Sequence, residues 1–139
     1  VQPEFLTALR DPNLQAVVVC PSNPFISVEP ILALPGVRDA LIACPAPVIA
    51  VSPIIGGKAV KGPTAKMMAE LGLSPSAGAV AQRYGDLLDG YVVDLADTSE
   101  VQGIRPKVTL AQTLMRTLED REAVARIVLS AAAKLRRRA

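Results

Sequence analysis

The chain alternates between unbroken apolar runs and stretches in which apolar residues recur at helical spacing. Ala16–Cys20 and Val48–Val51 are apolar at every position, and Tyr91–Val93 and Lys107–Leu110 are two further segments of strand-like composition. Strands that helices cover on both faces, as in a parallel sheet, show unbroken runs of this kind. We therefore predict four strands, the first two of them parallel, adjacent or nearly so, and buried on both faces.

Helix-type patterns fill the stretches between and around these strands. Proline suits the first turn of a helix but interrupts a helix interior, so Pro35-Gly36 should divide the second helical stretch. The predicted helices span Pro3–Arg10, Glu29–Ala43 with that interruption, Thr64–Leu71, Ser76–Leu88 and Glu119–Leu135. This order predicts a three-layer, Rossmann-like α/β fold with a mostly parallel sheet flanked by helices. Ligands of such sheets bind beyond the carboxyl ends of the strands.

The chain contains neither a repeat nor a low-complexity linker, so we predict a single domain over residues 1–139. It begins with a helical pattern and not with a strand and a glycine-rich nucleotide turn. We therefore expect the C-terminal portion of one α/β domain whose N-terminal half is absent. Residues 134–139 carry four bases and no acid, and we interpret them as a basic tail.

The composition excludes several classes of function. Aromatic residues make up only 3% of the chain, which leaves few rings for stacking on nucleic-acid bases. Four of the 15 basic residues lie in the tail, which leaves 11 against 13 acidic residues and no basic surface for nucleic acid. Without histidine the chain has no Ser-His-Asp or Cys-His nucleophile, and oxygen atoms would bind any metal, as they do Mg²⁺. No apolar run reaches the roughly 18 residues of a membrane span, and we expect a cytoplasmic protein.

Polar side chains follow the first predicted strand, in the loop Pro21–Ser27. Ser22, Asn23 and Ser27 are residues of the kind that cap the N-terminus of a following helix. The free N–H groups of the same helix end also bind phosphate. The loop is therefore either a turn with a helix cap or part of a ligand site.

The second loop, Ser52–Pro63, also leads from a buried strand into a helix. It contains paired glycines, Gly56 and Gly57, which let the backbone approach a ligand closely. It also contains two lysines, Lys58 and Lys61. This combination favours phosphate binding, and the alternative is a glycine-rich turn with two solvated lysines. The loop is not a P-loop, because Pro63-Thr64 stands where that motif requires Lys-Ser/Thr.

Other polar residues are less specific. Asp94 and Asp97 follow a predicted strand and either share a magnesium ion or, as we favour, cap a helix or face solvent. Cys20 and Cys44 lie outside any Cys-x-x-Cys pair, and we expect both to be buried. We expect three charged residues on the surface: Arg38, Asp39 and Arg83.

From about Ala16 to Leu129, the sequence resembles the 2-phospho-L-lactate transferase family. Around the first loop, the similarity lies in Ser22-Asn23-Pro24-Phe25, Pro30-Ile31-Leu32 and Pro35-Gly36-Val37-Arg38. Around the second loop, it lies in Val51-Ser52-Pro53-Ile54-Ile55-Gly56-Gly57, Val60-Lys61-Gly62-Pro63 and Lys66-Met67-Met68.

This resemblance implies a magnesium-dependent transferase of coenzyme F420 biosynthesis that is Rossmann-like and dimeric. Such an enzyme moves a 2-phospholactate-type group from a guanosine diphosphate-linked donor to the deazaflavin Fo and releases GMP. The donor is lactyl-2-diphospho-5'-guanosine or its enolpyruvyl equivalent, and in some relatives the acid is a glycerate. The resemblance implies Lys61 as the catalytic charge and assigns no metal ligand. The substrate-binding residues that it implies are Ser22, Asn23, Pro24, Ser27, Ser52, Gly56, Gly57, Lys58 and Gly62.

The family also begins with a glycine-rich nucleotide turn and acidic residues that this chain does not contain, so we expect the chain to be inactive by itself. Two alternatives from other classes stay open. One is a non-catalytic nucleotide or sugar-nucleotide binding regulator of the same superfamily, and the other is a structural half-domain that only dimerises. The transferase is favoured because such regulators tend to have a Gly-Ser run where Ser22-Asn23-Pro24 stands here.

Overall fold

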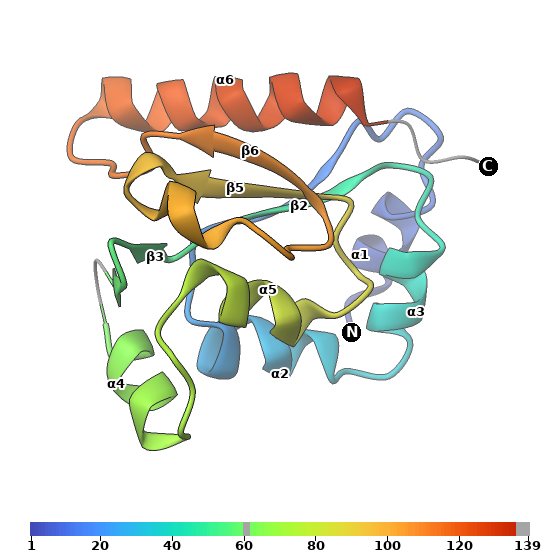
Figure 1. Ribbon diagram of the computed structural model, residues 1–139. Helices are drawn as coiled ribbons and strands as arrows, with labels where there is room; N and C mark the ends of the chain where they lie inside the picture. Colours follow the sequence, from blue (N-terminus) through green and yellow to red (C-terminus); the bar gives the residue numbers. More distant parts are fainter. Residues whose placement is uncertain (60–61, 136–139) are drawn as a thin grey trace.

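The computed structural model describes residues 1–59 and 62–135, and its centre is a four-stranded sheet. Strands β1 (Val17–Val19), β2 (Val48–Val51), β5 (Gly90–Asp94) and β6 (Lys107–Ala111) lie in the order β1-β2-β5-β6. Each neighbouring pair is parallel, so all four carboxyl ends lie at one edge of the sheet (Figure 1). The four predicted strands and the adjacent, parallel pairing of the first two are confirmed.

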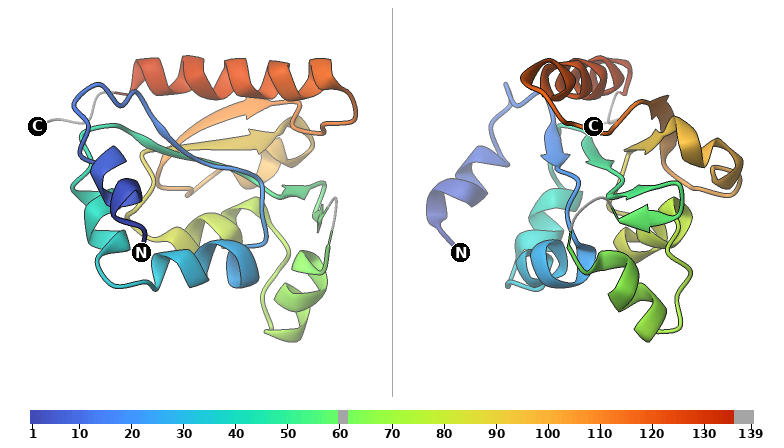
Figure 2. Two further views of the ribbon diagram at one scale, coloured as in Figure 1. Left: turned by 180° about the vertical axis from the view of Figure 1, so that it is seen from behind. Right: turned by 90° about the vertical axis from the view of Figure 1, so that its left-hand side faces the viewer.

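Helices lie on both faces of this sheet and give the predicted three-layer α/β fold (Figures 1 and 2). One face is covered by α6 (Leu118–Lys134), and the other by α2 (Glu29–Leu32), α3 (Val37–Ile42) and α5 (Ala77–Tyr84). The structure also describes α1 (Pro3–Ala8), α4 (Thr64–Glu70), a π-helical turn η1 (Pro24–Val28) and a 3-10 helix η2 (Leu95–Glu100). None of the described helices has the length and apolar character needed to cross a membrane.

Strand β2 contributes to two hydrophobic clusters, one on each face of the sheet. Val48 and Ala50 belong to the larger cluster, together with residues of α3 and α5. Ile49 and Val51 belong to the second cluster, together with residues of α6. All four side chains are buried, as the unbroken apolar run of this strand predicted.

Strand β1 is less buried than its sequence predicted. Val18 is 40% exposed, so the prediction that this strand is buried on both faces is wrong. Of the two cysteines that were expected to be buried, Cys44 is buried and Cys20 is exposed. The reason is the position of β1: within the described residues, β2 is its only strand partner, which leaves it at the end of the sheet. An apolar groove lies beside it, lined by Val18, Cys20, Pro21, Val51, Met115, Arg121, Val124, Ala125, Val128 and Leu129.

The second loop contains a two-stranded hairpin that the sequence analysis did not predict. Its strands, β3 (Ile54–Ile55) and β4 (Lys58–Ala59), pair antiparallel, and Gly56 and Gly57 form the turn between them. Both glycines have positive φ angles, +58° and +70°. A two-residue hairpin turn of this type requires positive φ at both positions, which glycine adopts without strain. The hairpin accounts for the paired glycines by itself.

The predicted helices are present, with differences at their ends. The second helical stretch is divided at Pro35-Gly36, between α2 and α3, as predicted. The helix predicted over Ser76–Leu88 ends at Tyr84, because Gly85 adopts a φ of +61°. Leu87 and Leu88 are nevertheless buried in the connection to β5, so they belong to the core without being helical.

Candidate functional site

A cavity of about 270 Å³ opens at the carboxyl edge of the sheet. Its wall comes from the connections that follow β1, β2 and β6 and from the first turns of α4 and α6. The lining residues are Pro21, Ser22, Asn23, Ser52, Pro53, Ile55, Thr64, Thr113, Leu114, Met115 and Arg121. The two loops that the sequence singled out therefore meet at one edge, as the parallel order of the strands predicted.

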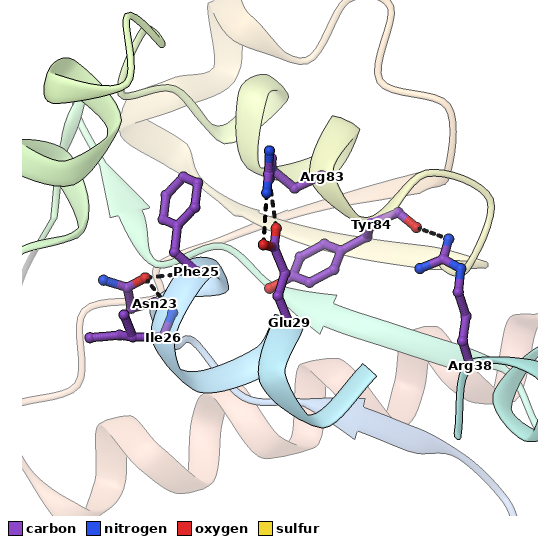
Figure 3. A network of polar contacts seen from close by, with 7 residues as sticks. All are labelled: Asn23, Phe25, Ile26, Glu29, Arg38, Arg83 and Tyr84. Atoms are coloured by element: carbon purple, nitrogen blue, oxygen red, sulfur yellow. Dashed lines mark hydrogen bonds and ion pairs between the residues drawn. The ribbon is translucent and has the colours of Figure 1, made fainter. Parts of the chain in front are cut away.

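Asn23 holds the first loop in place by capping the π-helical turn η1. Its Oδ1 accepts hydrogen bonds from the backbone N–H groups of Phe25, at 2.9 Å, and Ile26, at 3.3 Å (Figure 3). Its Nδ2 lies 3.4 Å from the sulfur of Met67, which is a weak acceptor. The capping interpretation is therefore right for the oxygen of Asn23, whereas the amide nitrogen keeps donor capacity at the cavity wall.

The first loop is also tied to α5. Arg83 donates two hydrogen bonds to the carboxylate of Glu29, at 2.6 and 2.7 Å, and its guanidinium lies 5.0 Å from the ring centre of Phe25 (Figure 3). The hydrogen bond to Glu29 raises the pKa of Arg83, and burial acts in the opposite direction. Arg83 is therefore more than the surface charge predicted from the sequence, because it fixes the helical segment that begins directly after Ser22 and Asn23.

Arg38 makes a similar connection further along the same face. Its guanidinium donates hydrogen bonds to the carbonyl of Tyr84 and to the carboxylate of Asp86, both at 2.9 Å. The hydrogen bond from Arg38 lowers the pKa of Asp86. Together, Arg83 and Arg38 join the two helices that follow β1 to α5 and the segment after it.

Ser52 is buried at the cavity wall, directly after β2. Its hydroxyl accepts a hydrogen bond from the N–H of Ile54, at 3.2 Å, and donates one to the carbonyl of the same residue, at 3.3 Å. These contacts begin the turn into the hairpin.

Tyr91 lies on β5, the strand next to β2. Burial raises the pKa of Tyr91 far above its usual value, so its hydroxyl stays neutral.

A buried carboxylate holds the glycine turn of the hairpin. Asp97 of η2 accepts hydrogen bonds from the backbone N–H groups of Gly56, at 3.0 Å, and Gly57, at 3.2 Å. The N–H groups that resemble a phosphate-binding turn in the sequence thus bind an acid of the same chain. Neither glycine is among the cavity-lining residues.

The residues proposed from the sequence are therefore divided. Ser22, Asn23 and Ser52 line the cavity. Lys61 lies outside the described residues. The other proposed residues belong to the same loops without lining the cavity: Pro24, Ser27, Gly56, Gly57, Lys58 and Gly62.

The third part of the wall, Thr113–Met115 and Arg121, was not predicted from the sequence. Thr113 is held by Asp94, whose Oδ2 accepts hydrogen bonds from the backbone N–H of Thr113, at 2.7 Å, and from its hydroxyl, at 3.0 Å. These residues follow β6, and the last strand of a parallel sheet ends at the same edge as the others. That rule could have pointed to Thr113–Met115, which come shortly after the strand.

The carboxylates at this edge accept hydrogen bonds from the backbone of the same chain. The other oxygen of Asp94 accepts a hydrogen bond from the N–H of Ala96, at 2.9 Å, and both oxygens of Asp97 accept N–H groups of the glycine turn. These N–H contacts give both carboxylates a structural role in their own turns. In the described part of the chain, no three Asp, Glu, Cys or His residues gather as metal ligands do. The cap interpretation of Asp94 is confirmed.

Comparison with known protein families shows to which family the chain belongs. The model of the family described as 2-phospho-L-lactate transferase CofD matches residues 1–129. The chain belongs to the CofD family. The resemblance seen in the two loops is thus confirmed over most of the chain, including the β6–α6 connection that forms the third wall.

Curated phosphoenolpyruvate and 2-phospho-L-lactate transferases are similar to the chain. A phosphoenolpyruvate transferase of Kitasatospora aureofaciens is 39% identical over 94% of this chain and 40% of its own length. A 2-phospho-L-lactate transferase of Halobacterium salinarum is 44% identical over 87% of this chain and 33% of its own. A 2-phospho-L-lactate transferase of Methanosarcina barkeri is 38% identical over 93% of this chain and 41% of its own length. The chain thus spans about 40% of the length of such relatives.

Proposed function

We propose that this chain is the C-terminal portion of a transferase domain that moves a 2-phospholactate-type group to the deazaflavin Fo in coenzyme F420 biosynthesis. The donor is linked to guanosine diphosphate, and GMP is released. The observation that carries the proposal is the cavity, because both family-like loops contribute to its wall through Ser22, Asn23 and Ser52. Membership of the CofD family supports the same reaction.

The reaction makes modest chemical demands on the protein. The side-chain hydroxyl oxygen of Fo forms a bond to the phosphorus that carries the acid, and the hydroxyl proton passes to solvent. The bond from this phosphorus to the oxygen that bridges to GMP breaks, and GMP leaves with that oxygen. Catalysis of such a step consists of alignment and stabilisation of charge and needs no protein nucleophile. A chain without histidine is therefore suited to it.

In this proposal, Ser22, Asn23 and Ser52 contact the donor directly. The remaining loop residues shape the two loops around it: Pro24 and Ser27 in the first, and Gly56, Gly57, Lys58 and Gly62 in the second. Mg²⁺ belongs to the proposal because the family resemblance implies it, and it supplies positive charge to the diphosphate. Since no three described metal-binding side chains gather in one place, we assign its ligands to the diphosphate and to parts of the family fold outside this chain. The homodimer and the cytoplasmic location stay predictions.

The second loop supplies the catalytic test, through Lys61. If Lys61 stabilises charge on the transferred phosphate, Lys61→Ala in the complete protein lowers turnover by about two to three orders of magnitude, with a smaller change in donor affinity. Lys107→Ala is the matched control, because Lys107 is exposed, begins β6 at the edge of the sheet away from the carboxyl ends, and is absent from the cavity wall. Steady-state kinetics with a guanosine diphosphate-linked donor, Fo and Mg²⁺ measure both.

Three outcomes separate the hypotheses. Turnover of Lys61→Ala within about threefold of the parent removes Lys61 from the chemistry. Binding of the nucleotide without any turnover by the complete protein supports the regulator in place of the transferase. For residues 1–139 alone we expect no turnover, and robust activity of this chain contradicts the expectation that the rest of the family fold is needed.

A further inference from the structure

Arg121 differs from every other residue of the cavity wall. Within the part of the chain that the structure describes, it is the only charged side chain that lines the cavity. No carboxylate of a described residue forms a salt bridge with it. The acids nearest in sequence have other partners: Asp120 accepts the N–H groups of Arg116 and Thr117, and Glu122 pairs with Arg126. Among the described residues, the guanidinium of Arg121 therefore has no ion-pair partner and can bind a ligand.

The rest of the wall supplies neutral donors. Thr64 is only 2% exposed, lines the cavity, and makes no side-chain hydrogen bond with the residues that the structure describes. Thr64 therefore places a hydroxyl donor at the cavity wall. The amide nitrogen of Asn23 has only the weak sulfur acceptor of Met67.

Acceptors with a negative charge are turned away from this wall. The two buried carboxylates at the same edge, Asp94 and Asp97, accept hydrogen bonds from backbone N–H groups and do not line the cavity. A cavity with one positive charge, free hydroxyl and amide donors and no carboxylate among the described residues favours an anion with several oxygens. The planar guanidinium of arginine matches phosphate oxygens in a two-pronged geometry.

We propose that Arg121 is the residue that binds the diphosphate of the ligand, and that the hydroxyl of Thr64 donates a hydrogen bond to the same group. This inference deepens the proposed function and rests on it for the guanosine part of the ligand. It adds to the site a positive charge on α6, outside both loops that resemble the family. Arg121 then determines ground-state affinity for the diphosphate, whereas Lys61 of the second loop acts on the transferred phosphate during the reaction.

The test measures binding and not turnover. Isothermal titration calorimetry of the complete protein uses two probes, inorganic pyrophosphate and GDP. Arg121→Gln weakens binding of both by at least about tenfold, because a charge-assisted contact is lost, whereas Arg121→Lys keeps part of the affinity. Thr64→Val, which keeps the shape of the side chain, weakens both by about fivefold. Arg126→Gln on the same helix is the control and changes binding by less than about twofold.

The outcomes distinguish this inference from the proposed function. If the parent binds GDP and Arg121→Gln binds it equally well while remaining folded by circular dichroism, the role of Arg121 is overturned and the transferase stands. If pyrophosphate binds through Arg121 but GDP binds no better than pyrophosphate, the inference stands and the guanosine-linked donor falls. If the parent binds neither probe, both are overturned.

Discussion

Thr113 donates two hydrogen bonds, from its backbone N–H and from its hydroxyl, to one carboxylate oxygen of Asp94. The two residues lie at the ends of neighbouring parallel strands, β5 and β6. Both are buried, and Thr113 lines the cavity. Asp94 thus fixes the connection that leads to Arg121, just as Asp97 fixes the turn of the hairpin after β2.

The first prediction concerns the stability that this contact provides. Asp94→Asn places an amide group against the N–H of Thr113 and removes a charged acceptor. We expect the free energy of unfolding to fall by about 2 kcal/mol, in the range for hydrogen bonds to charged groups. Urea denaturation measures the change, and Glu122→Gln, an exposed residue on α6, is the control. A loss no larger than that of Glu122→Gln contradicts the prediction.

The second prediction concerns pH. Burial on its own raises the pKa of Asp94, but the hydrogen bonds from Ala96 and Thr113 outweigh it, and the pKa lies below the ordinary value of 3.8. A carboxylate whose pKa is lowered by folding stabilises the protein above its unfolded pKa, and this stabilisation is lost as the pH falls through the folded pKa. The stability difference between the parent and Asp94→Asn should therefore be constant from about pH 5 upward and shrink below about pH 4. Urea titrations across this range test it, and a difference that does not change with pH contradicts it.

The hydrophobic pattern was sufficient to locate the strands of this fold, but not their exposure. The apolar run Val48–Val51 predicted a strand buried on both faces, and all four residues of this strand are buried. The run in β1 is equally apolar, yet Val18 is 40% exposed. Exposure at the end of a sheet depends on which element lies beside the strand, and a single strand's sequence does not contain that information.

Only part of the candidate site was predicted, and the reason is related. Ser22 and Ser52 were found because each follows a recognisable strand and belongs to a family-like segment. The Gly56-Gly57 pair between two short apolar segments is also a hairpin signal, and the phosphate interpretation obscured it. Arg121 was missed because its place on the cavity wall depends on the path of the chain after β6, which the local sequence does not specify.

The third prediction concerns the glycine turn. Asp97→Asn leaves only one oxygen for two N–H donors, so the turn should open more often. We expect the amide hydrogens of Gly56 and Gly57 to exchange at least about tenfold faster, because a charge-assisted hydrogen bond is lost. Hydrogen–deuterium exchange with mass spectrometry measures this, with the exposed Asp39→Asn as the control. Equal exchange in the two variants would show that Asp97 does not hold the turn.

The fourth prediction concerns the ion pair behind the first loop. The side chains of Arg83 and Glu29 are 39% and 30% exposed and meet through two hydrogen bonds. Because the geometry is bidentate and partly shielded, a double-mutant cycle with Arg83→Gln and Glu29→Gln should give a coupling energy of about 0.5–1 kcal/mol. The pair Arg126–Glu122, at 3.5 Å and 78% and 56% exposed, should give close to zero. Equal coupling in both cycles would contradict a special role for the first pair.

The last prediction concerns the outer edge of β1. Within the described residues no strand pairs with this edge, and the groove beside it is lined mostly by apolar side chains, with Val18 40% and Leu129 56% exposed. Unpaired strand edges and contiguous apolar surface favour association with a second polypeptide. We therefore expect residues 1–139 by themselves to self-associate, with a weight-average mass that rises with concentration in sedimentation velocity.

Two variants assign this association to the groove. Val18→Lys places a charge on the strand edge, and Leu129→Glu places one on the opposite wall, where a partly exposed position tolerates it. Each should shift the protein toward monomer at equal concentration, whereas Leu71→Lys, at a 59% exposed position on another surface, should not. Circular dichroism confirms that each variant is folded. A parent chain that stays monomeric at every concentration contradicts the prediction, and an equal effect of Leu71→Lys assigns the association to a different surface.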